Sequence, residues 1–166
     1  MLTWKRESDK LGLHATSRRV TPGGYCYHVL NRGNARQRVF HKDADFSAFL
    51  RLFDEAQDRC PTRLLAFCLM PNHFHLVLWP LGDGDVSRWM QWIQTTHVRR
   101  YHGHYHTTGH VWQGRFKAFP IQEDEHLLTV LRYVERNPSR AGLLRGRLAV
   151  VLVAAAFGSA AAALVQ

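Results

Sequence analysis

Short apolar runs bounded by turn-forming residues predict four β-strands along the chain. The runs occupy residues 25–30, 64–69, 73–79 and 111–117. The second run is apolar throughout, which is typical of a buried strand, and the fourth alternates between apolar and polar residues. Met70-Pro71-Asn72 predicts a tight turn between the second and third runs, because proline fits poorly inside a strand.

Apolar residues spaced i, i+3, i+4 and i+7 predict two amphipathic helices between these strands. The first has Phe46, Phe49, Leu50 and Phe53 on one face, and the second has Val86, Trp89, Met90 and Ile93. Asp43 and Asp45 suit the start of the first helix, Pro61 ends it, and residues 99–101 end the second. A third helix is expected from about Asp124 to Asn137, because acidic residues 123–125 favour its start and Pro138 its end.

The resulting order, β-α-β-β-α-β-α, predicts an α+β fold with a ferredoxin-like antiparallel sheet and helices packed on one face. We divide the chain into a basic N-terminal arm (1–21), one domain (22–147) and an Ala/Val-rich tail (148–166) that has no charged residue. For the tail we expect a packed helix or a disordered segment. A membrane span is less favoured, because Gly158-Ser159 interrupts the apolar run.

Composition and charge narrow the class of function. The chain has 166 residues, 46% of them hydrophobic and 21% charged, which suits a globular domain and excludes collagen and coiled coils. Lys plus Arg number 22 against 13 Asp plus Glu, so the net charge of +9 indicates a polyanionic partner, most often nucleic acid. Cys26, Cys60 and Cys68 lack the paired spacing of a zinc ribbon, which favours reduced thiols in a cytosolic protein. The first ten residues contain no apolar run, so no secretory signal is expected.

Four residues carry candidate chemistry. His73 and His75 are two apart on a predicted strand, so both imidazoles share one face and can supply two ligands of a metal site. Tyr133 and Asn137 are four apart on a predicted helix, where they offer a nucleophilic oxygen and an amide ligand on one face. Each pair also has a plain structural reading: two surface histidines, and a half-buried tyrosine with an asparagine that precedes a proline.

Other histidines and cations need a separate interpretation. Four histidines lie within residues 102–110 and suggest either a zinc or nickel site or, preferably, a loop that faces DNA or solvent. They are His102, His104, His106 and His110. Nine basic residues are candidates for phosphate contacts, with solvated surface charge as the alternative for each. They are Arg18, Arg19, Arg32, Arg36, Arg38, Arg99, Arg100, Arg115 and Lys117.

Four segments together resemble one known family. They are residues 27–34 (YHVLNRGN), 70–76 (MPNHFHL), 109–116 (GHVWQGRF) and 133–142 (YVERNPSRAG). They resemble the IS200-like transposases, and most closely the branch of REP-associated tyrosine transposases. The likeness extends from about Thr21 to Leu144, whereas the tail departs from the family's usual polar C-terminus.

The resemblance implies a metal-dependent single-strand DNA endonuclease and strand transferase of the HUH type. It assigns Tyr133 as the catalytic nucleophile and His73, His75 and Asn137 as ligands of one Mg²⁺ or Mn²⁺ ion, with no nucleotide cofactor. Cleavage would pass through a 5′-phosphotyrosine, at hairpin or palindromic repeat DNA. We expect a monomer or homodimer in the bacterial cytoplasm, associated with the nucleoid, with single-stranded or hairpin DNA as partner and no membrane. The alternatives are a non-catalytic module that binds single-stranded DNA or RNA on the same fold, and a metal-dependent hydrolase that uses water, with the histidines of residues 102–110 as ligands.

Overall fold

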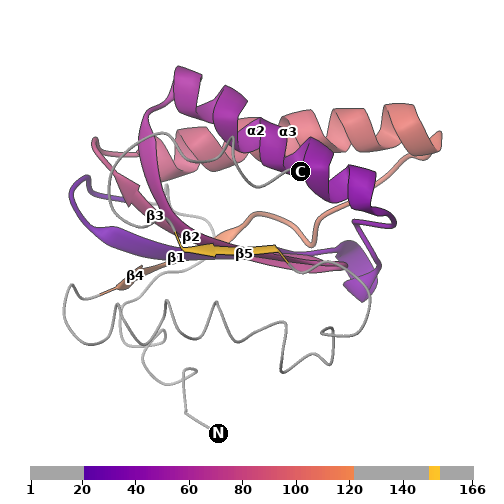
Figure 1. Cartoon of the computed structure of the whole chain (residues 1–166), viewed down its shortest axis with the longest axis horizontal. Helices are drawn as coiled ribbons and strands as arrows, with labels where there is room; N and C mark the ends of the chain where they lie inside the picture. Colours follow the sequence, from indigo (N-terminus) through magenta and orange to yellow (C-terminus); the bar gives the residue numbers. More distant parts are fainter. Residues whose placement is uncertain (1–20, 122–149, 154–166) are drawn as a thin grey trace, which may run out of the picture.

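The computed structural model describes residues 21–121 and 150–153 of the chain. Within these residues, five strands form one sheet, which Figure 1 shows edge-on. The strand order is β4-β1-β3-β2-β5, and every neighbouring pair is antiparallel. The strands are β1 (Cys26–Arg32), β2 (Thr62–Met70), β3 (His73–Pro80), β4 (Lys117–Ile121) and β5 (Val150–Val153). The order of the first four is ferredoxin-like, so the predicted α+β class and sheet type are confirmed.

The hairpin of β2 and β3 provides the centre of the sheet. Pro71 and Asn72 form its two-residue turn, and Met70 pairs with His73 directly beside that turn. β3 pairs on its other side with β1, so both of its neighbours are β-strands. The predicted turn at Pro71 is confirmed, and it places the start of β3 at one end of the sheet.

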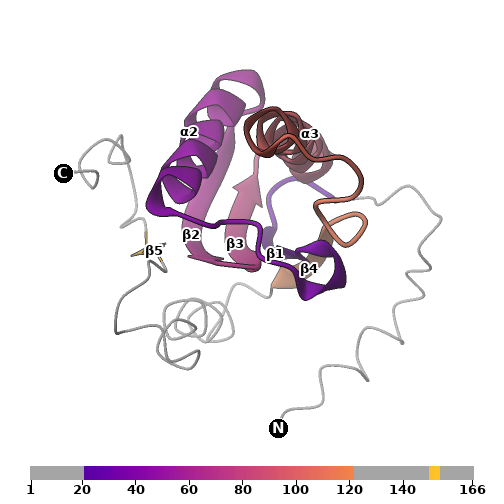
Figure 2. The ribbon, with the colours of Figure 1, turned by 90° about the vertical axis from the view of Figure 1, so that its right-hand side faces the viewer.

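Two long helices, α2 (Asp43–Arg59) and α3 (Asp85–Tyr105), lie side by side on one face of the sheet (Figure 2). The apolar side chains whose spacing predicted these helices point towards the sheet. Among them, Phe49, Trp89 and Ile93 are at most 1% exposed. From β3, Phe74 and Leu76 point into the same core and are fully buried. Each such side chain contributes about 1.5–3 kcal/mol when it leaves water, so this layer dominates the stability of the fold.

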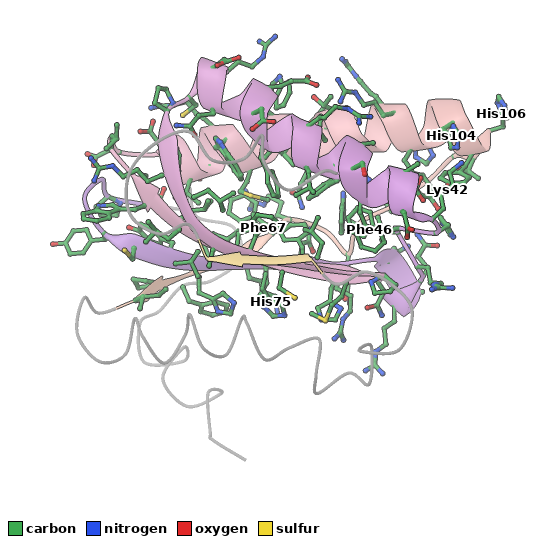
Figure 3. The ribbon with its side chains drawn as sticks, viewed as in Figure 1. Lys42, Phe46, Phe67, His75, His104 and His106 are labelled. Atoms are coloured by element: carbon green, nitrogen blue, oxygen red, sulfur yellow. The ribbon has the colours of Figure 1, made fainter. Side chains whose placement is uncertain are left out.

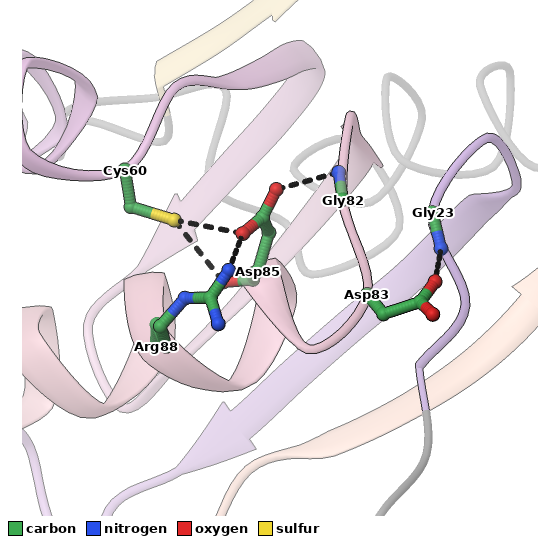
Figure 4. A network of polar contacts seen from close by, with 6 residues as sticks. All are labelled: Gly23, Cys60, Gly82, Asp83, Asp85 and Arg88. Carbon is green, nitrogen blue, oxygen red and sulfur yellow. Dashed lines mark hydrogen bonds and ion pairs between the residues drawn. The ribbon is translucent and has the colours of Figure 1, made fainter.

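A polar network joins the start of α3 to the end of α2 (Figure 4). The buried carboxylate of Asp85 accepts hydrogen bonds from the Gly82 amide (2.7 Å) and the Cys60 thiol (3.4 Å), and it forms an ion pair with Arg88. Burial and the neighbouring Asp85 raise the pKa of the Cys60 thiol, which keeps it protonated as a donor. The network therefore fixes the first turn of α3 against the preceding helix.

The fourth strand lies later than the sequence predicts. The strand β4 begins at Lys117, and residues 111–116 form a loop that makes a single β-bridge, between Gly33 and Trp112. Trp112 is 5% exposed and packs edge-on against Phe74, with ring centroids 5.2 Å apart. Gly114 has a positive φ of 69°, which ends any extended run. The prediction of a strand over 111–117 is therefore wrong for all but its last residue, because this segment buries its aromatic side chain in the helical layer.

The helix α3 also extends further than predicted. It runs to Tyr105 and therefore includes residues 102–105 of the expected loop, and His106 ends it in the left-handed conformation. The Tyr105 hydroxyl donates to the Asp45 carboxylate (2.6 Å), and its ring contacts that of Tyr101. These tertiary contacts give the last helical turn partners that its own sequence does not reveal.

The tail contributes a strand to the sheet edge. β5 pairs with β2 from Ala66 to Leu69, so the expectation of a helix or disordered segment is wrong for residues 150–153. Consecutive β-branched valines have high strand propensity, and an edge of β2 is available to pair with them. The expected third helix, most of the N-terminal arm and the rest of the tail lie outside the described residues. Within the described part of the chain, no helix has the length and apolar character to cross a membrane.

Candidate metal and nucleic-acid site

His73 and His75 lie on the face of the sheet opposite the helices. Figure 3 shows Phe67 on the helix side and His75 on the other side of the same sheet. The ring centroids of His73 and His75 are 5.3 Å apart. The His75 side chain is 7% exposed, and that of His73 is partly exposed. The predicted shared face is confirmed, because alternate residues of β3 point to opposite sides.

A third histidine, from β1, joins this pair. The Nε2 atom of His28 lies 2.9 Å from Nδ1 of His75, and the two ring planes differ by 16°. Leu30 pairs with His75 across the two strands, so His28 is two residues further along β1 on the same face. Three imidazoles therefore lie in a row across two central strands.

The turn residue Asn72 holds the other imidazole. Its Oδ1 atom lies 2.6 Å from Nδ1 of His73, and its Nδ2 group donates to the Arg36 carbonyl oxygen (3.3 Å). Asn72 thus connects the hairpin turn to the loop that follows β1. Both His73 and His75 have Nδ1 engaged by a neighbouring side chain.

The surroundings keep all three imidazoles neutral. Burial lowers the pKa of His75 to about 3, with further lowering by His28, His73 and Arg32. Burial lowers the pKa of His28 to about 4, and burial together with Arg32 lowers that of His73 to about 4. Neutral imidazole is the form that binds a metal ion, so the donor set fits a divalent cation.

The described residues supply only part of a coordination shell. Within residues 21–121, no three or more His, Cys, Asp or Glu side chains are grouped so as to hold a metal ion. The expected third ligand, Asn137, and the expected nucleophile, Tyr133, lie outside the described residues. A site built on His73 and His75 would therefore take its remaining ligands from elsewhere.

The end of β1 and the loop that follows it wrap around the hairpin turn and carry three candidate cations. The Gly33 amide donates to the Asn72 carbonyl (2.8 Å), and the Val39 amide donates to the Pro71 carbonyl (2.7 Å). Arg32 pairs with His73 at the end of β1. The other two, Arg36 and Arg38, are exposed in the same loop.

A second loop brings two more cations to this end of the sheet. The buried side chain of Asn31 accepts from the Arg32 amide (2.8 Å) and donates to the Gly114 carbonyl (3.2 Å). The exposed residues Arg115 and Lys117 follow that anchored glycine. We call these five cations the basic end of the sheet: Arg32, Arg36, Arg38, Arg115 and Lys117.

The remaining candidate cations are placed differently. Arg99 and Arg100 are exposed on α3, in the layer on the opposite face from the histidines. Arg100 forms an ion pair with Glu55 of α2 at 2.9 Å. Arg18 and Arg19 lie outside the described residues, and a DNA-binding role for all nine cations stays a prediction.

The histidines at the end of α3 have separate partners. His102 bonds the Thr107 hydroxyl (2.9 Å) and the Gly109 carbonyl (3.0 Å), whereas His104 lies 2.7 Å from the Lys42 ammonium (Figure 3). His106 and His110 are exposed. His102 and His104 belong to the last turn of α3 rather than to the expected loop, and their separate partners give no support to a zinc or nickel site among the described residues.

Sequence reasoning missed three residues that organise the site: His28, Asn31 and Asn72. All three belong to the segments that resemble the transposase family, which is the one signal that singles them out. Their contacts depend on the register of β1 against β3 and on the path of two loops, and local patterns do not encode either feature.

Comparison with known proteins agrees with this geometry. The model of the family described as transposase IS200 like matches residues 23–137. A protein of Haemophilus influenzae named as a REP-associated tyrosine transposase is 25% identical over 105 residues, which is 57% of this chain and 59% of that protein. The chain thus spans about three fifths of the length of this curated relative.

A solved structure shares the fold. It is that of a REP-associated tyrosine transposase bound to a REP hairpin, with a TM-score of 0.59 and 21% identity over 80% of this chain and 77% of that one. The expected resemblance is therefore confirmed. Because the family model matches well over half of the sequence, the chain belongs to the IS200-like transposases.

Proposed function

We propose that this chain is a metal-dependent single-strand DNA endonuclease and strand transferase that acts on hairpin or palindromic repeat DNA. The observation that carries the proposal is the pair His73 and His75, two neutral imidazoles side by side on a rigid strand. The pair adjoins the basic end of the sheet and lies within the matched family region. A binding module alone needs no such pair.

We assign the ligation of one Mg²⁺ or Mn²⁺ ion to His73, His75 and Asn137. When bound, this ion supplies Lewis-acid polarisation of the scissile phosphate. The nearby Arg32 lowers the pKa of both histidines, which means that it disfavours any added positive charge. A DNA phosphate offsets that repulsion, so metal and DNA are expected to bind together better than either alone.

Tyr133 is the proposed nucleophile. Its phenolic oxygen forms a bond to phosphorus and releases its proton, while the bond from phosphorus to the 3′ oxygen breaks and that oxygen takes up a proton. The product is a 5′-phosphotyrosine with a separate 3′-hydroxyl end. Because a phosphodiester is exchanged for another, an incoming 3′-hydroxyl reverses the step and joins strands without a nucleotide cofactor.

The basic end of the sheet is suited to hold the strand. Arg36 and Arg38 are exposed in the loop that bonds the hairpin turn, and Arg32 pairs with His73, so phosphates bound by these arginines would lie beside the imidazole pair. The solved relative was bound to a REP hairpin, which favours hairpin DNA as the partner here. We expect the protein to act in the bacterial cytoplasm at the nucleoid, as a monomer or homodimer.

The decisive experiment uses a labelled DNA hairpin with single-stranded flanks and Mn²⁺, resolved on a denaturing gel. Wild type should give a covalent protein–DNA band, and Tyr133→Phe should abolish it while it still shifts the hairpin on a native gel. Tyr101→Phe is the matched control, because this hydroxyl contacts His41 on the helix side and should be dispensable. A band that persists in Tyr133→Phe would refute the assigned nucleophile.

The same gel separates the alternatives. Cleavage without a covalent band indicates a metal-dependent hydrolase that uses water. A shifted hairpin with neither cleavage nor adduct indicates a non-catalytic binding module.

A further inference from the structure

We propose that His28 and Asn72 are positioning residues that hold His75 and His73 with the proton on Nδ1, so that the Nε2 lone pairs of both would be available to a divalent cation. The inference rests on the proposed metal-dependent function. It concerns two residues with no ligand role of their own, and the observation behind it is that each ligand histidine is engaged at Nδ1.

The orientation of the Asn72 amide decides the tautomer of His73. Its Nδ2 group must donate to the Arg36 carbonyl, because a carbonyl oxygen only accepts. The Oδ1 atom therefore faces Nδ1 of His73 at 2.6 Å and can only accept a hydrogen bond from it. His73 consequently carries its proton on Nδ1, and its Nε2 lone pair is available to a metal ion.

The tautomer of His75 depends on the direction of its hydrogen bond with His28. Two neutral imidazoles share one proton in the hydrogen bond between Nε2 of His28 and Nδ1 of His75. If His28 donated that proton, His75 would carry its own proton on Nε2 and could not ligate a metal through that atom. For His75 to offer Nε2 to a metal ion, as the proposed function requires, His28 must accept this hydrogen bond, and His28 then carries its own proton on Nδ1.

Both positioning groups are themselves held by the fold. His28 lies within β1, which is paired on both sides, by β3 and β4. The Asn72 carbonyl accepts from the Gly33 amide at 2.8 Å, which fixes the turn against the loop after β1. Partners of this kind orient metal-bound histidines, and their loss typically costs 10- to 100-fold in metal affinity.

The first test needs no metal. Two-bond ¹H–¹⁵N correlation spectra of the ¹⁵N-labelled, metal-free protein distinguish the two neutral tautomers of each histidine. We expect both His73 and His75 to carry the proton on Nδ1. An Nε2-protonated form of either histidine in the wild type overturns the proposal for that residue.

The second test measures Mn²⁺ affinity by electron paramagnetic resonance, with and without hairpin DNA. His28→Phe and Asn72→Ala, which remove the acceptors, should each weaken Mn²⁺ binding by 10- to 100-fold. His28→Gln and Asn72→Asp retain an oxygen acceptor and should restore both the Nδ1 tautomer and affinity within a few-fold of wild type.

A matched control separates loss of the acceptor from loss of packing. Phe119 of β4 pairs directly with His28, so Phe119→Leu disturbs the same neighbourhood and should leave Mn²⁺ affinity within about twofold. Equal affinity of His28→Phe, Asn72→Ala and wild type overturns the proposal while the proposed function stands. If wild type binds no Mn²⁺ even with hairpin DNA, the proposed function fails, and the metal-free spectra still decide the tautomers. Those wild-type spectra also stand if a variant does not fold.

Discussion

At the scale of single residues, two buried histidines serve different ends. His75 lies between two other imidazoles on the face away from the helices, where neutral nitrogen lone pairs can serve a metal ion. His97 is 7% exposed in the helical core, with its ring 5.2 Å from that of Trp112. Burial lowers the pKa of both, to about 3 for His75 and about 4 for His97, but only His75 has neighbours that suggest chemistry.

Removal of either proposed metal ligand should separate cleavage from binding. His73→Ala and His75→Ala should each abolish hairpin cleavage and adduct formation, because two imidazoles provide the protein nitrogens of the site. Hairpin affinity, measured by gel shift without metal, should stay within a few-fold of wild type, since the arginines hold the strand. A parallel fall of affinity and cleavage in both variants would contradict this division of roles.

His97 should make folding stability depend on pH. Burial lowers its pKa to about 4 in the folded protein, against 6.5 for an unperturbed histidine, so the unfolded state binds more protons between these pH values. Stability should therefore fall as the pH drops from 6.5 towards 4, and His97 should contribute up to about 3 kcal/mol of that loss. Urea unfolding of His97→Phe at several pH values should show a shallower decline than wild type.

The slope of unfolding free energy against pH is the quantity that tests His97. The unfolding free energy at a single pH does not, because replacement by phenylalanine also changes packing at every pH. His104→Phe is the control, because this imidazole is exposed on the same helix and should leave the slope unchanged. An identical slope in His97→Phe and wild type would show that other groups cause the decline.

At the scale of elements, the loop from Gly33 to Phe40 links the sheet, the hairpin turn and the basic end. It uses left-handed backbone at Ala35 and Arg36, and its amides bond the turn carbonyls. Gly33 sits where the loop doubles back. A Cβ there would collide with the Gln37 carbonyl oxygen and lie 2.7 Å from Val39 Cγ2.

Gly33→Ala should therefore displace the loop that positions Asn72 and Arg36. We expect a loss of about 1–3 kcal/mol in unfolding free energy and weaker hairpin binding. Gly103→Ala is the matched control, because a Cβ at this helical position meets nothing within 4 Å and alanine favours a helix. Thermal unfolding and a gel shift test both variants, and equal behaviour would exclude a steric role for Gly33.

At the scale of the whole molecule, the two faces of the sheet have different contents. The helices bury one face in an aromatic core, whereas the other face carries the three imidazoles next to the basic end. The chain has a net charge of +9, and five of the candidate cations lie at the end of the sheet where β3 begins with His73. This asymmetry predicts that DNA approaches the end of the sheet at the hairpin turn.

Hairpin affinity should fall steeply with salt. If the five cations of the basic end each neutralise one phosphate, the slope of log affinity against log salt should be about −4. Arg36→Ala and Arg38→Ala should each reduce that slope by about 1. Arg51→Ala, an exposed arginine on α2, should leave it unchanged, and Arg100→Ala tests whether α3 also contacts DNA. Fluorescence anisotropy between 50 and 300 mM salt provides the measurement, and a flat profile would contradict phosphate-dominated binding.

Several parts of the fold were predictable because their signals are local. The periodicity of Phe46, Phe49 and Phe53 marks a helix face, and Pro71 marks the hairpin turn, since each depends only on neighbouring residues. The strand at Lys117 and the end of α3 at Tyr105 were misplaced, because long-range burial of Trp112 and the contact of Tyr105 with Asp45 decide them.

The sequence by itself determined the fold class, the shared face of His73 and His75, and the membership in the IS200-like transposases, through alternation along a strand and the order of four motifs. Only the tertiary structure decided that His28 and Asn72 engage those histidines at Nδ1. It also decided that residues 150–153 complete the sheet edge. The reason is physical: alternation is a property of one strand, whereas strand register and loop path arise from packing between segments far apart in the chain.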